Sequence, residues 1–119
     1  MNTHQEITPS AVRSATHSVR VVNTLGKAGH LIIDITVVPG IDTVTVSIQG
    51  RDPTSGKLYT ILASTALVAT GTTILKVGPG LPVTANLSAN DVLPHDLVIL
   101  FTHSAASSFT YSAGLQIVD

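Results

Sequence analysis

The chain has 119 residues and a formal net charge of −1, and only 11% of its residues are charged, against roughly 25% in a typical domain. It contains no cysteine, which excludes disulfides and thiolate metal ligands. It also has no cluster of basic residues, so direct nucleic-acid binding is not expected. Hydrophobic residues make up 44% and aromatic residues 3%, so aliphatic side chains must build the core. A surface with so few charged residues protects only weakly against association, which favours a protein that works within an assembly.

The first residues of the chain are polar and end near Pro9. We expect residues 1–11 to form an N-terminal arm, either frayed or reaching a neighbouring molecule, and residues 12–119 to form a single domain. The start lacks the basic and then apolar pattern of a secretory signal. No apolar stretch approaches the ~18 residues that a membrane-spanning helix needs, so no membrane contact is expected.

The sequence pattern of the first half of the domain predicts β-strands. Residues 12–22 predict one strand or two short ones, and residues 30–38 predict a strand that ends at Pro39. The connection to residues 43–49 is short, so we expect these two strands to pair in an antiparallel hairpin. Four alternating residues of the 30–38 strand should share the core face: Leu31, Ile33, Ile35 and Val37.

The clearest local pattern runs from Thr43 to Leu62. Alternating apolar and polar residues precede the turn-forming residues 50–56, and a second apolar run follows, which together predict a β-hairpin. In the turn, Asp52 should cap, Pro53 should fix φ, and Gly56 should take a left-handed conformation. The segment 52–57 superficially resembles the end of a phosphate-binding loop, but it lacks the required earlier glycine and leads into a strand.

The second half adds further strands. Residues 64–70 are ambiguous between a helical turn and extended chain, residues 72–77 predict a strand, and residues 83–90 could cross between sheets. Residues 96–103 form the most apolar run, so that strand should be covered on both faces. The closing segment, residues 108–118, contains Gly114 as a candidate bulge. Its candidate core residues are Phe109, Tyr111, Leu115 and Ile117.

About seven or eight strands, with turn signals every 8–12 residues or so, are typical of a β-sandwich. We therefore predict an all-β fold: a single-domain antiparallel β-sandwich, either jelly-roll or Ig-like.

Side chains with reactive chemistry do not form a recognisable motif. The five histidines have no compact metal-ligand spacing, the only glutamate is Glu6, and no nucleophile elbow occurs. We expect no catalytic, cofactor-binding or metal site, and no enzyme activity. The hairpin tip instead offers candidate partner-contact residues, with an ordinary solvated turn as the alternative. These candidates are Arg51, Asp52, Lys57 and Tyr59.

Several stretches resemble a group of small uncharacterised proteins encoded by tailed bacteriophages and prophages. They are SIQGRDPTSGKLYTILAS (47–64), ATGTTILKVGPGL (69–81), ANDVLP (89–94) and the closing segment 108–114. The resemblance covers about residues 28–118, and Leu58 departs from it where the group often has an aromatic residue. It implies a virion structural protein, and it provides no active-site residues to carry over.

The functional expectation follows from this resemblance. We expect a capsid decoration (cement) protein, made in the host cytoplasm and located on the capsid surface of the virion. Its partners would be the major capsid protein and copies of itself, as a trimer or a dimer. The alternatives are a neck, tail or fibre-associated virion protein and a carbohydrate-binding module. The last is disfavoured because the chain has no tryptophan and only two tyrosines, Tyr59 and Tyr111, to form a sugar platform.

Overall fold

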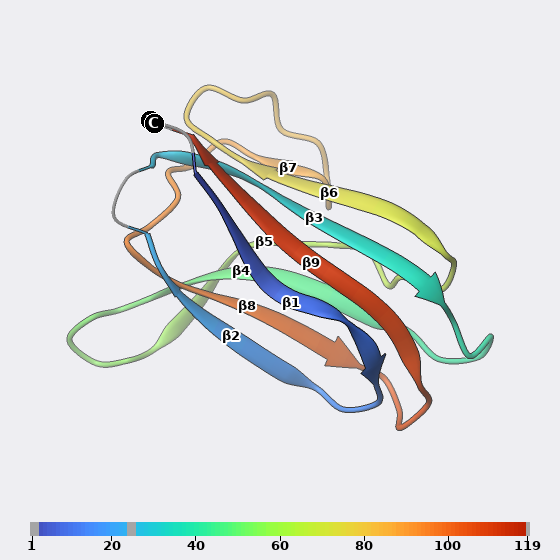
Figure 1. The fold of residues 1–119 in the computed structure, drawn as a ribbon. Helices are drawn as coiled ribbons and strands as arrows, with labels where there is room; N and C mark the ends of the chain where they lie inside the picture. The colour runs from blue at the N-terminus through green and yellow to red at the C-terminus, as the bar shows by residue number, and fades with distance from the viewer. Residues whose placement is uncertain (1–2, 24–25, 119) are drawn as a thin grey trace.

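The structure, a computed structural model, describes residues 3–23 and 26–118, which form two β-sheets packed face to face (Figure 1). The predicted β-sandwich is confirmed, with nine strands among the described residues. The strands are β1 (Thr3–Arg13), β2 (His17–Val22), β3 (Ala28–Val37), β4 (Val44–Arg51), β5 (Leu58–Ala63), β6 (Gly71–Val77), β7 (Ser88–Ala89), β8 (Asp96–His103) and β9 (Phe109–Val118).

The five-stranded sheet has the order β1-β9-β3-β6-β7, and the four-stranded sheet has the order β2-β8-β4-β5. All neighbouring strands are antiparallel except β6 and β7, which are parallel. The core lies between the sheets because each central strand turns alternate aliphatic residues inward, the period-2 pattern of a half-buried strand.

Most of the predicted core residues are buried. The four candidates on the closing strand are at most 5% exposed, and Leu31, Ile33 and Ile35 are at most 2% exposed. Val37 is the exception at 54% exposure, because a register irregularity between Ile35 and Val37 interrupts the alternation of β3. A one-residue shift in a strand turns the following side chains to the other face.

The strand β8 lies between β2 and β4 in the four-stranded sheet, and the predicted burial of both faces holds only in part, because Leu100 is half-buried and Thr102 is exposed on the outer face. Leu97, Ile99 and Phe101 are fully buried toward the core. On the outer face Val98 is also buried, at 6% exposure. The structure places this apolar run at a central position of its sheet, where β2 and β4 pair with both of its edges.

The N-terminal segment differs from the expected arm. Thr3–Arg13 forms β1, which pairs with β9 of the same chain and closes one edge of the five-stranded sheet. Ile7 and Thr8 are buried at 6% and 3% exposure. The register is irregular on both sides of Thr8, and β1 accommodates Pro9 in the second irregularity. The polar, proline-containing sequence of this segment suggested an arm. It is also compatible with an irregular edge strand, which needs few apolar residues and tolerates proline.

The predicted pairing of the strand at residues 30–38 with the strand at residues 43–49 is wrong. β3 belongs to the five-stranded sheet and β4 to the four-stranded sheet, so the connection between them crosses from one layer to the other. Both strands carry a continuous buried face, and two such faces can bury one another only from opposite sheets. Loop length alone did not distinguish a hairpin from this crossing.

The remaining local predictions agree with the structure in part. β4 and β5 form the predicted antiparallel hairpin. The ambiguous segment 64–70 is not helical and includes a bridge between Leu67 and Val44. The register irregularity expected at Gly114 is present, but the additional residue lies opposite it in β1, between Glu6 and Thr8. The crossing predicted for residues 83–90 lies later in the chain, because these residues include β7 of the five-stranded sheet and the change of sheet occurs between β7 and β8.

Candidate functional site

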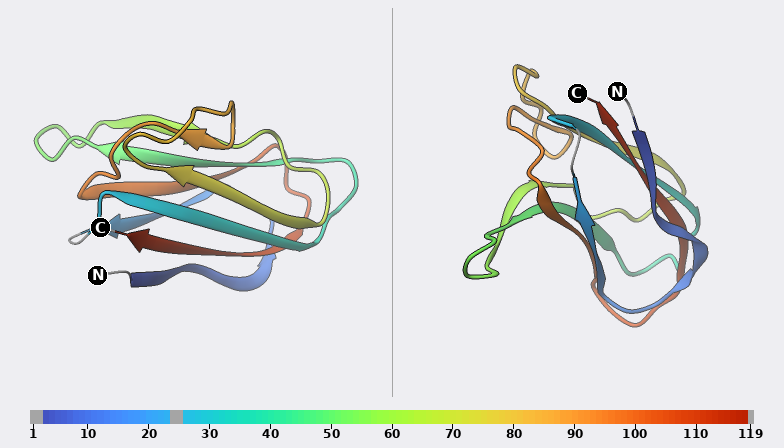
Figure 2. Two further views of the ribbon diagram at one scale, coloured as in Figure 1. Left: turned by 90° about the horizontal axis from the view of Figure 1, so that it is seen from above. Right: turned by 60° about the vertical axis from the view of Figure 1, so that its left-hand side comes forward.

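The β4–β5 hairpin projects beyond the body of the sandwich, as both views of Figure 2 show. We call residues 51–59 the hairpin tip. Its turn is closed by two backbone hydrogen bonds, from the Asp52 amide to the Lys57 carbonyl at 2.8 Å and from the Gly56 amide to the Asp52 carbonyl at 2.8 Å. Gly56 has φ of +78°, the left-handed conformation expected from the sequence.

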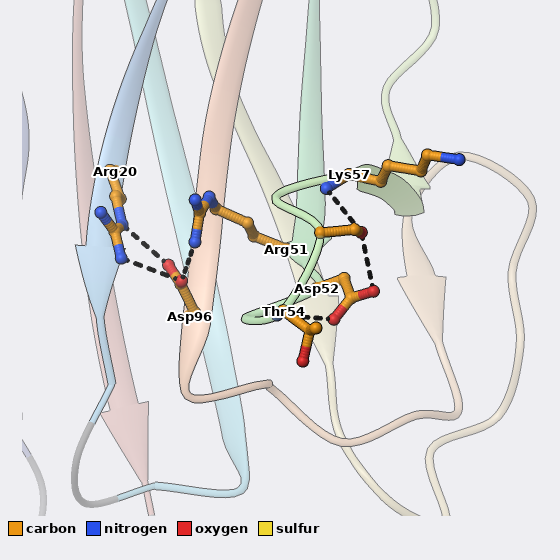
Figure 3. Close-up of polar contacts among 7 residues, drawn as sticks. Arg20, Arg51, Asp52, Thr54, Lys57 and Asp96 are labelled. Carbon is orange, nitrogen blue, oxygen red and sulfur yellow. Dashed lines mark hydrogen bonds and ion pairs between the residues drawn. The ribbon is translucent and has the colours of Figure 1, made fainter.

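The Asp52 carboxylate organises this turn (Figure 3). It accepts hydrogen bonds from the Thr54 amide at 2.9 Å and from the Ser55 hydroxyl at 2.8 Å. These contacts, that with Thr54 first, hold the pKa of the Asp52 carboxyl below its ordinary value. The predicted capping role of Asp52 is confirmed. Its acceptor capacity is partly used inside the turn, so this carboxylate mainly shapes the tip.

Arg51 points away from the turn and reaches the carboxylate of Asp96 at the start of β8 (Figure 3). Arg51 Nη1 lies 3.0 Å from Asp96 Oδ2, and Arg20 of β2 donates from Nε and Nη2 to the two carboxylate oxygens, each at 3.0 Å. We call these three residues the Asp96 cluster. It joins three strands across the outer face of the four-stranded sheet.

The three side chains of the Asp96 cluster differ in their exposure to solvent. The Asp96 side chain is 10% exposed, against 30% for Arg51 and 59% for Arg20. The hydrogen bonds from Arg20 and then those from Arg51 hold the pKa of the Asp96 carboxyl below its ordinary value. The same pairing raises the pKa of Arg20. The cluster therefore remains ionised and fixes the base of the hairpin.

Arg20 and Asp96 are not among the residues predicted from the sequence. They lie 76 residues apart in the chain, and Arg51 lies 45 residues from Asp96, so no local spacing joins them. The only signal available was an acidic residue at the start of a strand that is otherwise apolar and buried. Such a carboxylate requires a partner, because burying an unpaired charge is costly.

Tyr59 is the aromatic residue of the hairpin tip. It pairs across the hairpin with Gly50, and its side chain is packed over that glycine, since a Cβ at Gly50 would lie 2.1 Å from Tyr59 Cζ. The residue remains 53% exposed, and the neighbouring Leu58 is 49% exposed. Lys57 is exposed beside them. Of the four predicted contact residues, Lys57 and Tyr59 face solvent most openly, whereas Arg51 and Asp52 are engaged within the chain.

A second polar cluster lies at the opposite end of β8. The His17 ring stacks on Phe101 with centroids 4.6 Å apart, and His103 Nε2 is hydrogen-bonded to the Tyr111 hydroxyl at 2.9 Å. Arg13 covers the Tyr111 ring, with its guanidinium carbon 5.0 Å from the centroid. We call these five residues the aromatic–histidine cluster. It closes the core at this end with rings contributed by both sheets.

Burial controls the ionisation of the aromatic–histidine cluster. Desolvation, followed by the nearby His17 and Arg13, lowers the pKa of His103 below its ordinary value. Burial raises the pKa of Tyr111 to about 12. His103 Nδ1 has no hydrogen-bond partner within the described part of the chain, so a proton added there would gain no acceptor. The folded protein therefore favours the neutral imidazole.

This arrangement predicts that acid destabilises the fold through His103. Because the pKa of His103 is lowered on folding, the unfolded chain binds its proton first as pH falls through the ordinary value of 6.5. Stability should thus decrease with falling pH between that value and the lower pKa of the folded state. Denaturant unfolding from pH 7 to pH 5 should show a smaller loss for His103→Gln than for the parent. His30→Gln, at an exposed position, is the matched control, and equal losses for His103→Gln and the parent would contradict the prediction.

The described residues contain no candidate metal centre. Within residues 3–23 and 26–118, no three histidine, aspartate or glutamate side chains lie close enough to hold an ion together. The described residues also contain no helix that is long and apolar enough to cross a membrane.

Comparisons with known proteins do not assign the chain to a family. No protein-family model matches the chain, and no curated protein matches it. Among solved structures, the chain is similar to one from the infectious bursal disease virus Gx strain, with 15% identity and a TM-score of 0.42. The match covers 98% of this chain but only 31% of that chain. A similarity this weak carries no argument about function.

Proposed function

We propose that the protein is a structural component of a bacteriophage virion, a decoration protein that binds the major capsid protein and stabilises the head. The observation that carries the proposal is the projecting hairpin tip, which presents Lys57, Leu58 and Tyr59 to solvent on a turn fixed by its own hydrogen bonds. A preorganised tip loses little conformational freedom on docking, which favours binding through a small surface.

The composition supports the same role. A β-sandwich with few charged residues and no recognisable catalytic motif in its sequence suits a protein that acts by binding other proteins. The resemblance to small phage and prophage proteins includes the hairpin tip itself, residues 51–59. On a capsid the same modest contact is repeated by symmetry, so each copy needs only moderate affinity.

The carbohydrate-binding alternative has less support. Sugar platforms require exposed aromatic faces, and this chain has two tyrosines, two phenylalanines and no tryptophan. Tyr111, Phe101 and Phe109 are fully buried. Tyr59 is therefore the only exposed aromatic residue, and one face of its ring is packed over Gly50. A single tyrosine with one free face is a poor sugar platform.

A binding experiment on capsids tests the proposal. Truncating Tyr59 to alanine should weaken cosedimentation with capsids that lack the protein by about tenfold or more, because aromatic residues at interfaces are common hot spots. Val83→Ala, at a 71% exposed position outside the tip, is the matched control and should bind like the parent. Equal binding of Tyr59→Ala and the parent would remove the hairpin tip from the interface.

The location on the particle separates decoration from a neck, tail or fibre role. Quantitative mass spectrometry of purified virions should find copies in numbers comparable with the major capsid protein. A cryo-EM map should place them across the capsid surface. Density at a single vertex would instead favour the neck or tail alternative.

A further inference from the structure

We infer that the free edge of β2 pairs with β2 of a second copy in antiparallel orientation, which joins two four-stranded sheets into one continuous sheet. The inference deepens the self-association part of the proposed function by naming its surface. Its test uses the purified chain without capsid, so its failure and the failure of capsid binding can be told apart.

The sandwich has four sheet edges, and three of them are protected. β1 has two register irregularities and contains Pro9. β7 is only two residues long. β5 has a register irregularity opposite Ile48, and the Asn86 side chain donates to the carbonyl of Ala63 at 3.0 Å. Irregularities, proline and short length are the usual devices that prevent edge-to-edge pairing.

β2 has none of these devices. His17–Val22 pairs with β8 in unbroken register over six residues and contains neither proline nor glycine. Its residues are mostly β-branched or small, which suits a further strand beside it. Val22, at 54% exposure, adds apolar surface at the end of the strand.

The backbone groups that face the free edge can be assigned from the ladder. The Asn23 amide donates to the His95 carbonyl, and opposite residues in an antiparallel pair alternate between hydrogen-bonded and open positions. The odd-numbered residues of β2 therefore bond to β8. The amides and carbonyls of Ser18, Arg20 and Val22 point outward, and the described residues provide no backbone partner for them.

Arg20 is the one charge on this edge, and charged side chains normally discourage pairing. Here Asp96 binds its guanidinium through two hydrogen bonds, so the charge is offset in part within each copy, by a carboxylate that Arg20 shares with Arg51. The Asp96 cluster also keeps the Arg20 side chain on the outer face of the sheet and away from the open backbone edge.

The sequence of β2 selects a register for the pairing. With Val19 on the twofold axis, Ser18 faces Arg20 of the partner copy, His17 faces Val21, and the outward backbone groups of Ser18 and Arg20 bond to each other. Residues 17–21 then pair entirely within β2. A register centred on Arg20 would set two guanidinium groups opposite each other, which is unfavourable.

Solution mass and a proline substitution test the inference. The parent should form a dimer of twice 12.3 kDa in sedimentation or light-scattering measurements. Ser18→Pro removes an outward amide from each copy without removing a β2–β8 hydrogen bond, so it should weaken dimerisation by about tenfold or more. Ser18→Ala keeps the amide and should dimerise like the parent. A monomeric parent, or an oligomer indifferent to Ser18→Pro, would overturn the inference.

Cysteine cross-linking tests the register even if the proline variant folds poorly. The chain has no cysteine, so a single introduced thiol can form a disulfide only between copies. Val19→Cys should give a disulfide-linked dimer under oxidising conditions, because open antiparallel pairs bring their Cα atoms to about 4.5 Å. Val21→Cys should not cross-link. Cross-linking at Val21, or at neither position, would refute this pairing.

Discussion

Replacement of Phe101 by alanine should lower the free energy of unfolding by about 3–5 kcal/mol. Phe101 is fully buried on β8 and packs against two rings, with centroid distances of 4.6 Å to His17 and 5.4 Å to Tyr111. Removing it would open a cavity beneath a cluster that the two sheets share. A chain with so few aromatic residues has no other large ring to fill that space.

Denaturant unfolding measures this effect directly. Domains of this size are stable by only about 5–15 kcal/mol, so Phe101→Ala should bring the protein close to unfolding at ambient temperature. Phe101→Leu is the matched control, because it retains most of the buried volume and should lose much less. A loss below about 1 kcal/mol for the alanine variant would contradict the assigned packing.

Deletion of residues 2–11 should lower the free energy of unfolding by more than about 3 kcal/mol, since it removes a buried aliphatic side chain and the hydrogen bonds of an edge strand. Ile7 is 6% exposed, and β1 pairs with β9 along most of its length. If residues 2–11 formed a detached arm, as their composition suggests, their deletion would leave the free energy of unfolding unchanged. The deletion therefore distinguishes an edge strand from an arm.

Single substitutions separate the contributions of β1. Ile7→Ala should cost about 2–5 kcal/mol, as for other buried aliphatic residues. Val12→Ala on the same strand is the control, because Val12 is 68% exposed and should change stability by no more than about 0.5 kcal/mol. Unchanged stability in both the deletion and Ile7→Ala would show that this segment does not belong to the sheet.

Short-range pattern predicted the elements that depend on their own residues. The β4–β5 hairpin follows from alternation and from a turn in which Asp52 and Gly56 act as their chemistry requires. The β8 strand follows from an uninterrupted apolar run. In both cases the backbone preference and the burial preference of neighbouring residues agree, so tertiary context had nothing to override.

The candidate site was predicted only in part. Lys57 and Tyr59 were found because they flank a recognisable turn. The contact of Arg51 with Asp96, and the participation of Arg20, depend on three strands that meet only in the folded sheet. The free edge of β2 likewise becomes apparent only when the strand order is known, because an edge is a property of the sheet.

The sequence by itself determined that this protein is a β-sandwich with an aliphatic core, because period-2 alternation and turn chemistry are local and are repeated along the chain. Only the tertiary structure decided which sheet each strand joins, that Thr3–Arg13 closes the five-stranded sheet, and that Asp96 is paired twice. Those choices rest on contacts between residues far apart in sequence. They are selected by the joint burial of two apolar faces and by the need to pair a buried charge, which no single segment encodes.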